Sequence, residues 1–209
     1  MSTIELRLFV DSRFMSPYAM SAFVALREKG ADFEVSTIDL GAEEHREPDY
    51  ANLSLTRRVP TLLHGDFSLS ESSAITEYID EVLPGARLYP REARAKARAR
   101  QLQAWLRSDL LALRAERSTE VVFCGPVDAA LSPEAQRAAD TLFSVADSLI
   151  GSEADDIFGE WSIVDLDLAI MLSRLVRNED PVPDKLLGWT KRQWSRPAAK
   201  LWVDRERAG

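Results

Sequence analysis

The sequence is poor in the residues that form disulfides and bind metals. Its 209 residues include one cysteine, Cys124, and two histidines, His45 and His64. One cysteine excludes an internal disulfide, and so few histidines argue against a metal site or a histidine-based catalytic triad. Cys124 follows the apolar residues 121–123, which favours a buried, unreactive thiol. We therefore expect neither a bound metal nor redox chemistry by a thiol of the protein itself.

Long apolar runs and an excess of positive charge are also missing. No apolar run approaches the roughly 20 residues of a membrane span, and the acids Glu5 and Asp11 near the start do not fit a secretory leader. The 34 acidic residues outnumber the 26 Lys and Arg, and the net charge of -8 argues against general nucleic-acid binding. We expect a cytoplasmic protein without a membrane or nucleic-acid partner.

The first 83 residues mix strand and helix patterns. Four runs have the alternation or composition of strands: residues 4–10, 33–38, 59–64 and 67–69. Ser16-Pro17 opens a helix that ends near Gly30, Gly65-Asp66 is a hairpin turn, and a second helix covers residues 72–83. The first strand, helix and strand require a right-handed parallel crossover. This order is that of a thioredoxin-like domain.

The second half is helical almost throughout. A long helix is expected over about 92–120, with four leucines facing inward: Leu102, Leu106, Leu110 and Leu113. Ser132-Pro133 and the capping box from Ser162 to Asp165 open further helices. Prolines and a glycine between the halves indicate a linker. We predict an α/β thioredoxin-like domain at 1–83, a linker at 84–91 and an all-helical bundle domain at 92–209.

The first candidate for chemistry is the turn Ser16-Pro17-Tyr18. It follows the first strand, so we expect the Ser16 hydroxyl and several free backbone N–H groups to meet at the carboxyl end of the sheet. Such a place stabilises an anion, and it would lower the pKa of a ligand thiol from its ordinary value of about 8.5. The alternative is an ordinary helix start, because Ser-Pro is common there without any function.

Two further candidate ligand-binding motifs lie in the first half of the chain, one just before a predicted strand and one just before a predicted helix. If Pro60 is cis, the backbone of Val59 lacks ladder partners and is free to pair with a bound peptide; the alternative is a trans proline at the start of a strand. Glu71-Ser72-Ser73 stands just before a helix, where hydroxyls and N–H groups suit a carboxylate and the acid suits an ammonium group. Its alternative is routine N-capping.

Together, the order and spacing of these three motifs match a glutathione site. On these residues the sequence resembles the cytosolic glutathione S-transferase family over nearly its whole length. Three phrases are similar to bacterial stress-associated members with transferase and peroxide-reducing activities: residues 28–30 (Glu-Lys-Gly), 56–60 (Thr-Arg-Arg-Val-Pro) and 70–75 (Ser-Glu-Ser-Ser-Ala-Ile). The fold that the resemblance implies is the same two-domain arrangement.

The resemblance implies a role for each motif. Ser16 would hydrogen-bond the glutathione sulfur, and Val59 before a cis Pro60 would pair with the cysteinyl backbone. Glu71 and Ser72 would hold the γ-glutamyl end.

Other assignments also depend on the resemblance. Arg58 and His45 are alternatives for the glycyl carboxylate, and Phe14, Trp105 and Leu113 would line the electrophile site. Asp165 matches the acid of the family's folding motif, so it is expected to be structural. The remaining tryptophans lie at helical core spacings and are expected to pack: Trp161, Trp189, Trp194 and Trp202.

The activity implied is conjugation of glutathione to small apolar electrophiles, with reduction of organic hydroperoxides, by a homodimer. Because Ser16 stands where disulfide-exchanging relatives place a cysteine, the reacting thiol must belong to glutathione. Two alternatives stay open: a non-catalytic, partner-binding protein on the same fold, and a glutathione-dependent isomerase. Isomerase relatives usually carry a Ser-Cys pair, which residues 16–19 lack.

Overall fold

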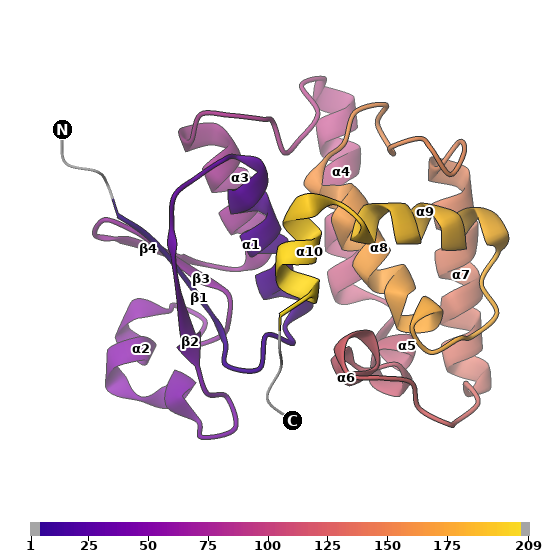
Figure 1. Ribbon diagram of the computed structural model, residues 1–209, viewed down its shortest axis with the longest axis horizontal. Coiled ribbons are helices and arrows are strands. Elements are labelled where there is room, and N and C mark those ends of the chain that lie inside the picture. The colour runs from indigo at the N-terminus through magenta and orange to yellow at the C-terminus, as the bar shows by residue number, and fades with distance from the viewer. Residues whose placement is uncertain (1–4, 206–209) are drawn as a thin grey trace. The chain divides into compact units, whose positions relative to one another are not determined.

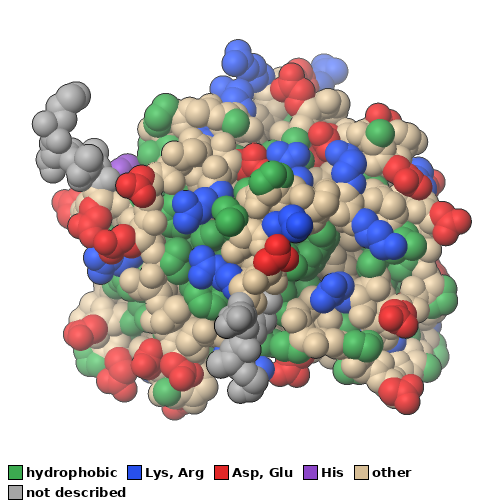
Figure 2. Space-filling view, in the orientation of Figure 1, with side chains coloured by type: hydrophobic (Ala, Val, Ile, Leu, Met, Phe, Trp, Pro, Cys, Tyr) green, Lys and Arg blue, Asp and Glu red, His purple; other side chains and the backbone are tan. Residues whose placement is uncertain are grey.

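A computed structural model describes residues 5–205 (Figure 1). The chain forms two compact units. The first unit consists of the chain up to Leu88 together with the residues from Asp204 onward. The second unit spans Tyr89–Val203. None of the helices in the described range is both long and apolar enough to cross a membrane. Acidic and basic side chains are interspersed on the face shown in Figure 2.

The first unit is built on a mixed four-stranded sheet of order β2-β1-β3-β4. Its elements are β1 (Leu6–Asp11), α1 (Pro17–Glu28), β2 (Glu34–Ile38), the 3-10 helix η1 (Glu44–Arg46), α2 (Pro48–Leu53), β3 (Thr61–His64), β4 (Phe67–Ser70) and α3 (Ser72–Val82). Strand β1 pairs in parallel with β2 and antiparallel with β3, which pairs antiparallel with β4. The expected thioredoxin-like order is confirmed.

Helices α1 and α3 pack together over the sheet and contribute most of this unit's core. Phe23, Ile75 and Ile79 are at most 1% exposed, and Leu8 and Val10 of β1 are fully buried. Gly30 ends α1 with a φ of 68°, and Ala31 N–H donates to the Leu26 carbonyl at 3.1 Å. This is the αL helix ending that the glycine predicts.

The segment expected as a linker contacts the first unit closely at Gly85 and Leu88. A Cβ on Gly85, whose φ is 106°, would stand 2.4 Å from the carbonyl oxygen of Lys29. The buried ammonium of Lys29 pairs with Asp80 at 3.4 Å, and the same carboxylate accepts from Leu88 N–H at 2.9 Å. Only glycine fits the turn, because any Cβ there would clash with the Lys29 backbone.

The second unit consists of helices alone. They are α4 (Ala93–Ser108), α5 (Leu111–Glu116), α6 (Thr119–Phe123), α7 (Pro133–Leu149), α8 (Ile163–Val176), α9 (Asp184–Trp194) and α10 (Pro197–Val203). Helix α8 is the most buried of them, and most of its side chains lie in the core.

The long helix expected over 92–120 is wrong: the chain breaks there into α4, α5 and α6. Asp109 ends α4 in an extended conformation, and Leu110 follows with a φ of 58°. Ser118 then starts α6 by accepting from Glu120 N–H. The breaks keep all four predicted leucines inward, since none of them exceeds 7% exposure. Apolar spacing found the buried face but not the interruptions, because the positive φ of Leu110 and the side-chain cap of Ser118 do not change the pattern of apolar residues.

The last residues that the structure describes group with the first unit. Arg205 belongs with the first unit, where its guanidinium lies 4.5 Å from the ring centre of Phe14 and 5.2 Å from that of Phe23. Arg27 lies over Phe23 and Phe33 in the same cluster. Burial, and then the nearby charge of Arg27, lower the pKa of Arg205. Cation–π stacking therefore joins the end of the chain to α1.

Candidate functional site

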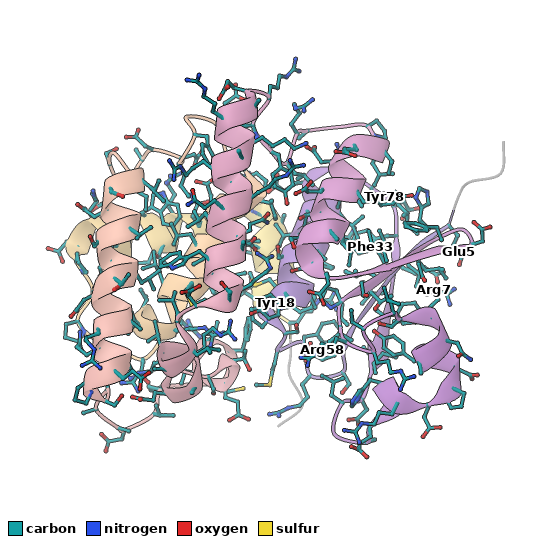
Figure 3. All side chains as sticks on the ribbon, turned by 180° about the vertical axis from the view of Figure 1, so that it is seen from behind. Glu5, Arg7, Tyr18, Phe33, Arg58 and Tyr78 are labelled. Atoms are coloured by element: carbon teal, nitrogen blue, oxygen red, sulfur yellow. The ribbon has the colours of Figure 1, made fainter. Side chains whose placement is uncertain are left out.

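The sheet brings the three candidate motifs to one edge. Register pairs Phe9 of β1 with Thr61 of β3, and Thr61 with Ser70 of β4. Strand β1 ends at this edge before Ser16, β3 begins there after Val59-Pro60, and β4 ends there before Glu71-Ser72. Figure 3 labels Tyr18 and Arg58 on two of the segments concerned. Antiparallel pairing thus gathers motifs that lie up to about 55 residues apart in the sequence.

Ser16 is the N-cap of α1, as its sequence predicts. It is half-buried, has an extended backbone with a φ of -75°, and its Oγ accepts from Ala19 N–H at 3.2 Å. The hydroxyl hydrogen of Ser16 has no acceptor among residues 5–205. One O–H donor is therefore available at the positive end of the helix.

The backbone around this turn differs from the expectation of several free N–H groups. Asp11, 6% exposed, accepts from Met15 N–H at 2.6 Å and from Ser16 N–H at 2.9 Å through its carboxylate. Phe14 N–H donates to the Asp11 carbonyl at 3.0 Å, and Phe14 has a φ of 52°. Because these N–H groups are occupied, the Ser16 hydroxyl is the donor of interest. The sequence signal for this role was the position of Asp11, an acid at the end of a strand and five residues before the N-cap Ser16.

The segment before β3 is held by hydroxyl groups that sequence reasoning missed. The carbonyl of Arg58 lies 2.7 Å from the Tyr50 hydroxyl, 3.0 Å from Thr61 Oγ1 and 3.3 Å from Ser54 Oγ. Tyr50 is 4% exposed, and burial is the main cause of the raised pKa of its hydroxyl. These residues come from α2 and β3, so only folding identifies them as partners.

The Val59–Pro60 bond held by this network is cis. Pro60 is buried and Val59 is partly exposed. Neither the backbone N–H nor the carbonyl of Val59 has a hydrogen-bond partner within the described residues. Both groups are thus available to pair with an extended peptide.

Glu71 and Ser72 stand at the start of α3. Glu71 is the N-cap residue, with a φ of 76° and a ψ of 114°, but its side chain makes no capping bond. A non-glycine residue in this region costs of order 1–3 kcal/mol and tends to occur at functional sites. The exposed Glu71 carboxylate is unpaired in the part of the chain that is described, while Ser72 is 3% exposed. Routine capping by Glu71 does not account for this geometry.

Both candidates for a carboxylate partner lie in the first unit. Arg58 is exposed, and its guanidinium forms no ion pair with residues 5–205. His45 lies in η1, and its buried Nδ1 has no hydrogen-bond partner there either. The geometry leaves both candidates open.

The residues expected around the electrophile have different surroundings. Phe14 is half-buried under Arg205, and Trp105 is half-buried on α4 in the other unit. Leu113 is fully buried on α5, so it offers a ligand no surface there.

The expectation of a buried Cys124 is wrong. Cys124 is exposed because it follows the last residue of α6, where the apolar side chains of residues 121–123 turn inward and the next residue does not. The described residues contain no cluster of three or more His, Cys, Asp and Glu that is arranged to hold a metal.

Asp165 has the structural setting expected of it. Its carboxylate accepts from Ile157 N–H at 2.8 Å, Ser162 N–H at 2.9 Å and Ser162 Oγ at 2.8 Å, which completes the predicted capping box. It is fully buried, and burial is the main cause of its raised pKa, although the hydrogen bonds from Ile157 and Ser162 lower it.

Comparison with protein families gives the class. Residues 9–81 match the N-terminal domain of glutathione S-transferases and residues 92–205 match the C-terminal domain. The chain belongs to the glutathione S-transferase family.

Glutathione S-transferase 3 of Zea mays is 37% identical over 94 residues, which are 44% of this chain and 40% of the relative. Glutathione S-transferase 1 of Dianthus caryophyllus is 36% identical over 83 residues, 40% of this chain and 38% of the relative. These matches span about two fifths of the curated relatives' length.

Solved structures extend the similarity to nearly the whole chain. A glutathione transferase homologue from Burkholderia gl BGR1, solved with bound glutathione, is 44% identical with a TM-score of 0.78, and each chain covers 97% of the other. A delta-class glutathione transferase from Nilaparvata lugens shares the fold at 20% identity, with a TM-score of 0.76 and coverage of 95% and 93%.

Proposed function

We propose that this protein binds glutathione at the sheet edge of its first unit and transfers it to small apolar electrophiles, with reduction of organic hydroperoxides as a second reaction. The observation that carries the proposal is the unpaired hydroxyl hydrogen of Ser16 at the N-terminus of α1. The open backbone of Val59 and the unpaired carboxylate of Glu71 at the same edge support it, as does the bound glutathione of the Burkholderia homologue.

In this proposal Ser16 donates a hydrogen bond to the glutathione sulfur and stabilises its thiolate. The thiolate then attacks the electrophile; with an aryl halide, a carbon–sulfur bond forms and halide leaves. With a hydroperoxide, it attacks the peroxide oxygen and releases an alcohol after protonation. A second glutathione converts the resulting sulfenic acid to the disulfide and water.

The rest of the site positions the tripeptide. Val59 pairs with the cysteinyl backbone next to Pro60, and Glu71 and Ser72 hold the γ-glutamyl ammonium and carboxylate. Arg58 or His45 meets the glycyl carboxylate. Phe14 and Trp105 supply apolar surface to the electrophile. A cytoplasmic homodimer completes the proposal.

Retention on immobilised glutathione and a substrate panel test the function. We expect the protein to bind the resin, to elute with free glutathione, and to turn over members of a panel of aryl halides, hydroperoxides and disulfides. Retention without turnover of any panel member would favour the non-catalytic alternative. No retention and no turnover would contradict the glutathione site itself.

The hydroxyl network under Val59 leads to a separate prediction. Tyr50→Phe removes the bond to the Arg58 carbonyl and should raise the KM for glutathione several-fold with little change in kcat, because the Val59 segment loosens. The same hydroxyl also bonds Thr61 Oγ1 at 3.0 Å, so the loss of folding stability should be about 1–3 kcal/mol, as expected for two buried hydrogen bonds. Steady-state kinetics and urea unfolding measure both quantities.

Tyr78→Phe is the matched control. It removes a hydroxyl that pairs with His64 Nδ1 at 2.9 Å, on the opposite end of β3 from Val59. It should lower stability without changing the KM for glutathione. Equal KM values in the two variants would show that the Tyr50 network does not position the site.

A further inference from the structure

Five side chains of the first unit form an alternating stack of aromatic rings and guanidinium groups. The guanidinium carbon of Arg205 lies 4.5 Å from the ring centre of Phe14 and 5.2 Å from that of Phe23. The guanidinium carbon of Arg27 lies 5.2 Å from the same Phe23 ring and 4.5 Å from that of Phe33, which Figure 3 labels. This Arg–Phe stack joins the last described residues of the chain to the turn before α1.

The position of Arg205 in the stack is unfavourable for its charge. Burial, and then the positive charge of Arg27, lower the pKa of Arg205, so the surroundings disfavour the charged guanidinium. The faces of the Phe14 and Phe23 rings help to offset this cost, because the negative face of an aromatic ring attracts a cation. The same attraction restrains the Phe14 ring.

Phe14 depends on its surroundings because its backbone is strained. Its φ of 52° lies in the left-handed region, which is unfavourable for a non-glycine residue and persists only where neighbouring groups hold it. One backbone bond, from Phe14 N–H to the Asp11 carbonyl at 3.0 Å, closes the turn. The half-buried ring under Arg205 adds a side-chain restraint to that bond.

The Phe14 backbone is connected directly to the Ser16 hydroxyl. The next two residues, Met15 and Ser16, donate their N–H groups to the Asp11 carboxylate at 2.6 Å and 2.9 Å. If Phe14 left the left-handed region, the chain from Asp11 to Ser16 would take another path and these two bonds would not both keep their geometry. The Ser16 Oγ, which caps α1 through Ala19 N–H, would then shift. A displacement of about 1 Å is enough to slow a reaction strongly.

We propose that Arg205 is a positioning residue for the proposed reaction, because its stacking on Phe14 fixes the turn that carries the Ser16 hydroxyl. The inference rests on the glutathione site proposed above. Arg205 acts through Phe14 and not by contact with glutathione. The turn supplies the hydrogen-bond donor, and a residue about 190 positions further along the chain holds that donor in place.

Arg205→Met tests the proposal, because it keeps most of the side chain's length and removes the guanidinium. We expect kcat/KM with glutathione to fall about ten-fold. In the Ser16→Ala background the same change should have no further effect, because the hydroxyl that Arg205 positions is gone. Effects that multiply in the double variant would show that Arg205 acts independently of Ser16, and they would overturn the proposal.

Arg205→Lys separates stacking from charge. Lysine keeps the positive charge but lacks the planar group that lies over a ring, so it should restore only part of kcat/KM. Full recovery would mean that a positive charge is sufficient and that stacking on Phe14 plays no part.

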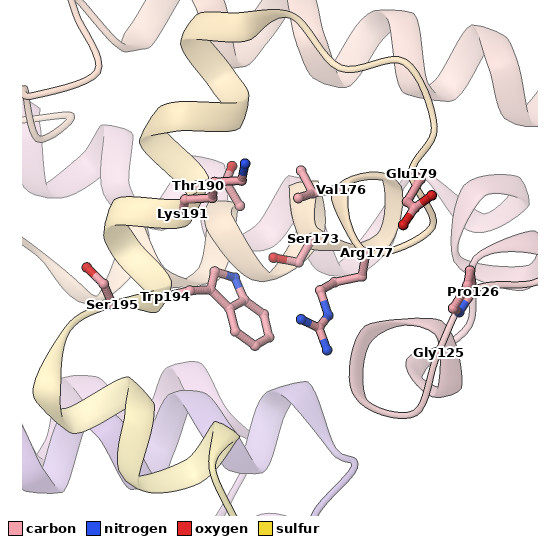
Figure 4. Close-up of a pocket in the computed structure, with 10 residues that line it drawn as sticks. All are labelled: Gly125, Pro126, Ser173, Val176, Arg177, Glu179, Thr190, Lys191, Trp194 and Ser195. Carbon is pink, nitrogen blue, oxygen red and sulfur yellow. The ribbon is translucent and has the colours of Figure 1, made fainter.

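Arg196→Met is the matched control. Arg196 is half-buried like Arg205, and its guanidinium carbon lies 4.2 Å from the ring centre of Trp161 in the second unit. It directly follows Ser195, which Figure 4 shows in the wall of a pocket of that unit. The substitution removes the same charge and the same kind of contact, so it should lower stability in urea but leave kcat/KM unchanged. Equal losses of kcat/KM in the two variants would contradict a positioning role.

Amide hydrogen exchange followed by NMR gives a measurement that needs no glutathione. The N–H groups of Met15 and Ser16 should exchange about ten-fold faster in Arg205→Met and at the wild-type rate in Arg196→Met. Unchanged exchange in Arg205→Met would overturn the proposal even if the protein is an active transferase. Faster exchange in a protein that neither binds nor turns over glutathione would support the restraint of the turn and contradict the proposed function instead.

Discussion

Replacing Ser16 by alanine should lower kcat/KM with glutathione about 100-fold while the protein stays folded. The variant loses the single O–H donor that the turn offers to the thiolate, and removal of one such donor typically costs 10²–10³-fold in rate. The backbone does not compensate, because the N–H groups of Met15 and Ser16 are bonded to Asp11. The apparent pKa of the pH–rate profile should also rise, since the neutral thiol gains at the thiolate's expense.

Two variants make the Ser16 result interpretable. Ser132→Ala removes another Ser-Pro N-cap, whose Oγ accepts from Ala135 N–H at the same 3.2 Å. It also breaks the bond from that hydroxyl to Glu116, so it should cost at least the capping loss of about 1 kcal/mol and still keep full activity. Ser16→Thr keeps a hydroxyl and should restore part of the activity. If Ser16→Ala retains wild-type kcat/KM and pH dependence, the hydroxyl is not the thiolate donor.

Replacing Asp165 by alanine should destabilise the protein by about 3 kcal/mol or more. The change leaves Ile157 N–H and both donors of Ser162 without a partner in a buried setting, and each unsatisfied group costs about 1–3 kcal/mol. It also removes the cap of α8, the most buried helix of its unit. Urea unfolding measures the loss.

Asp184→Ala is the control for this prediction. Asp184 is an exposed acid in the first turn of α9, so its removal should cost only the dipole contribution of about 0.5 kcal/mol. Similar losses in the two variants would contradict a capping role for Asp165.

The pH dependence of a milder variant, Asp165→Asn, follows from the raised pKa of Asp165. The pKa of Asp165 is higher in the folded protein than in the unfolded chain, so the protonated carboxyl group stabilises the fold. This stabilisation is complete at a pH below the unfolded pKa, and it is lost as the pH rises through the folded pKa. The advantage of wild type over Asp165→Asn should therefore be largest in acid and shrink toward neutral pH. An advantage that grows with pH would show that the hydrogen bonds outweigh the burial of the charge.

The sequence by itself determined the features that depend on near neighbours. Ser16, Ser132 and Ser162 cap helices through bonds that reach only three residues along the chain, so their motifs identify them. Gly30 ends α1 in the same local way. Apolar periodicity located the strands and the inward leucines, because burial of a face repeats with the geometry of the element.

Tertiary structure alone decided the features whose partners are distant in sequence or whose signal is weak. Tyr50 meets the Arg58 carbonyl only after α2 has packed beside the start of β3, and Trp194 reaches Ala169 across 25 residues. For the Ser16 turn, the motif located the hydroxyl, but only the folded positions of Asp11's carboxylate oxygens showed that the backbone N–H groups are occupied. A sequence pattern shows which residues face the same side of one helix or strand. Whether a hydrogen-bond donor is unpaired depends on the neighbours that folding brings to it from other elements.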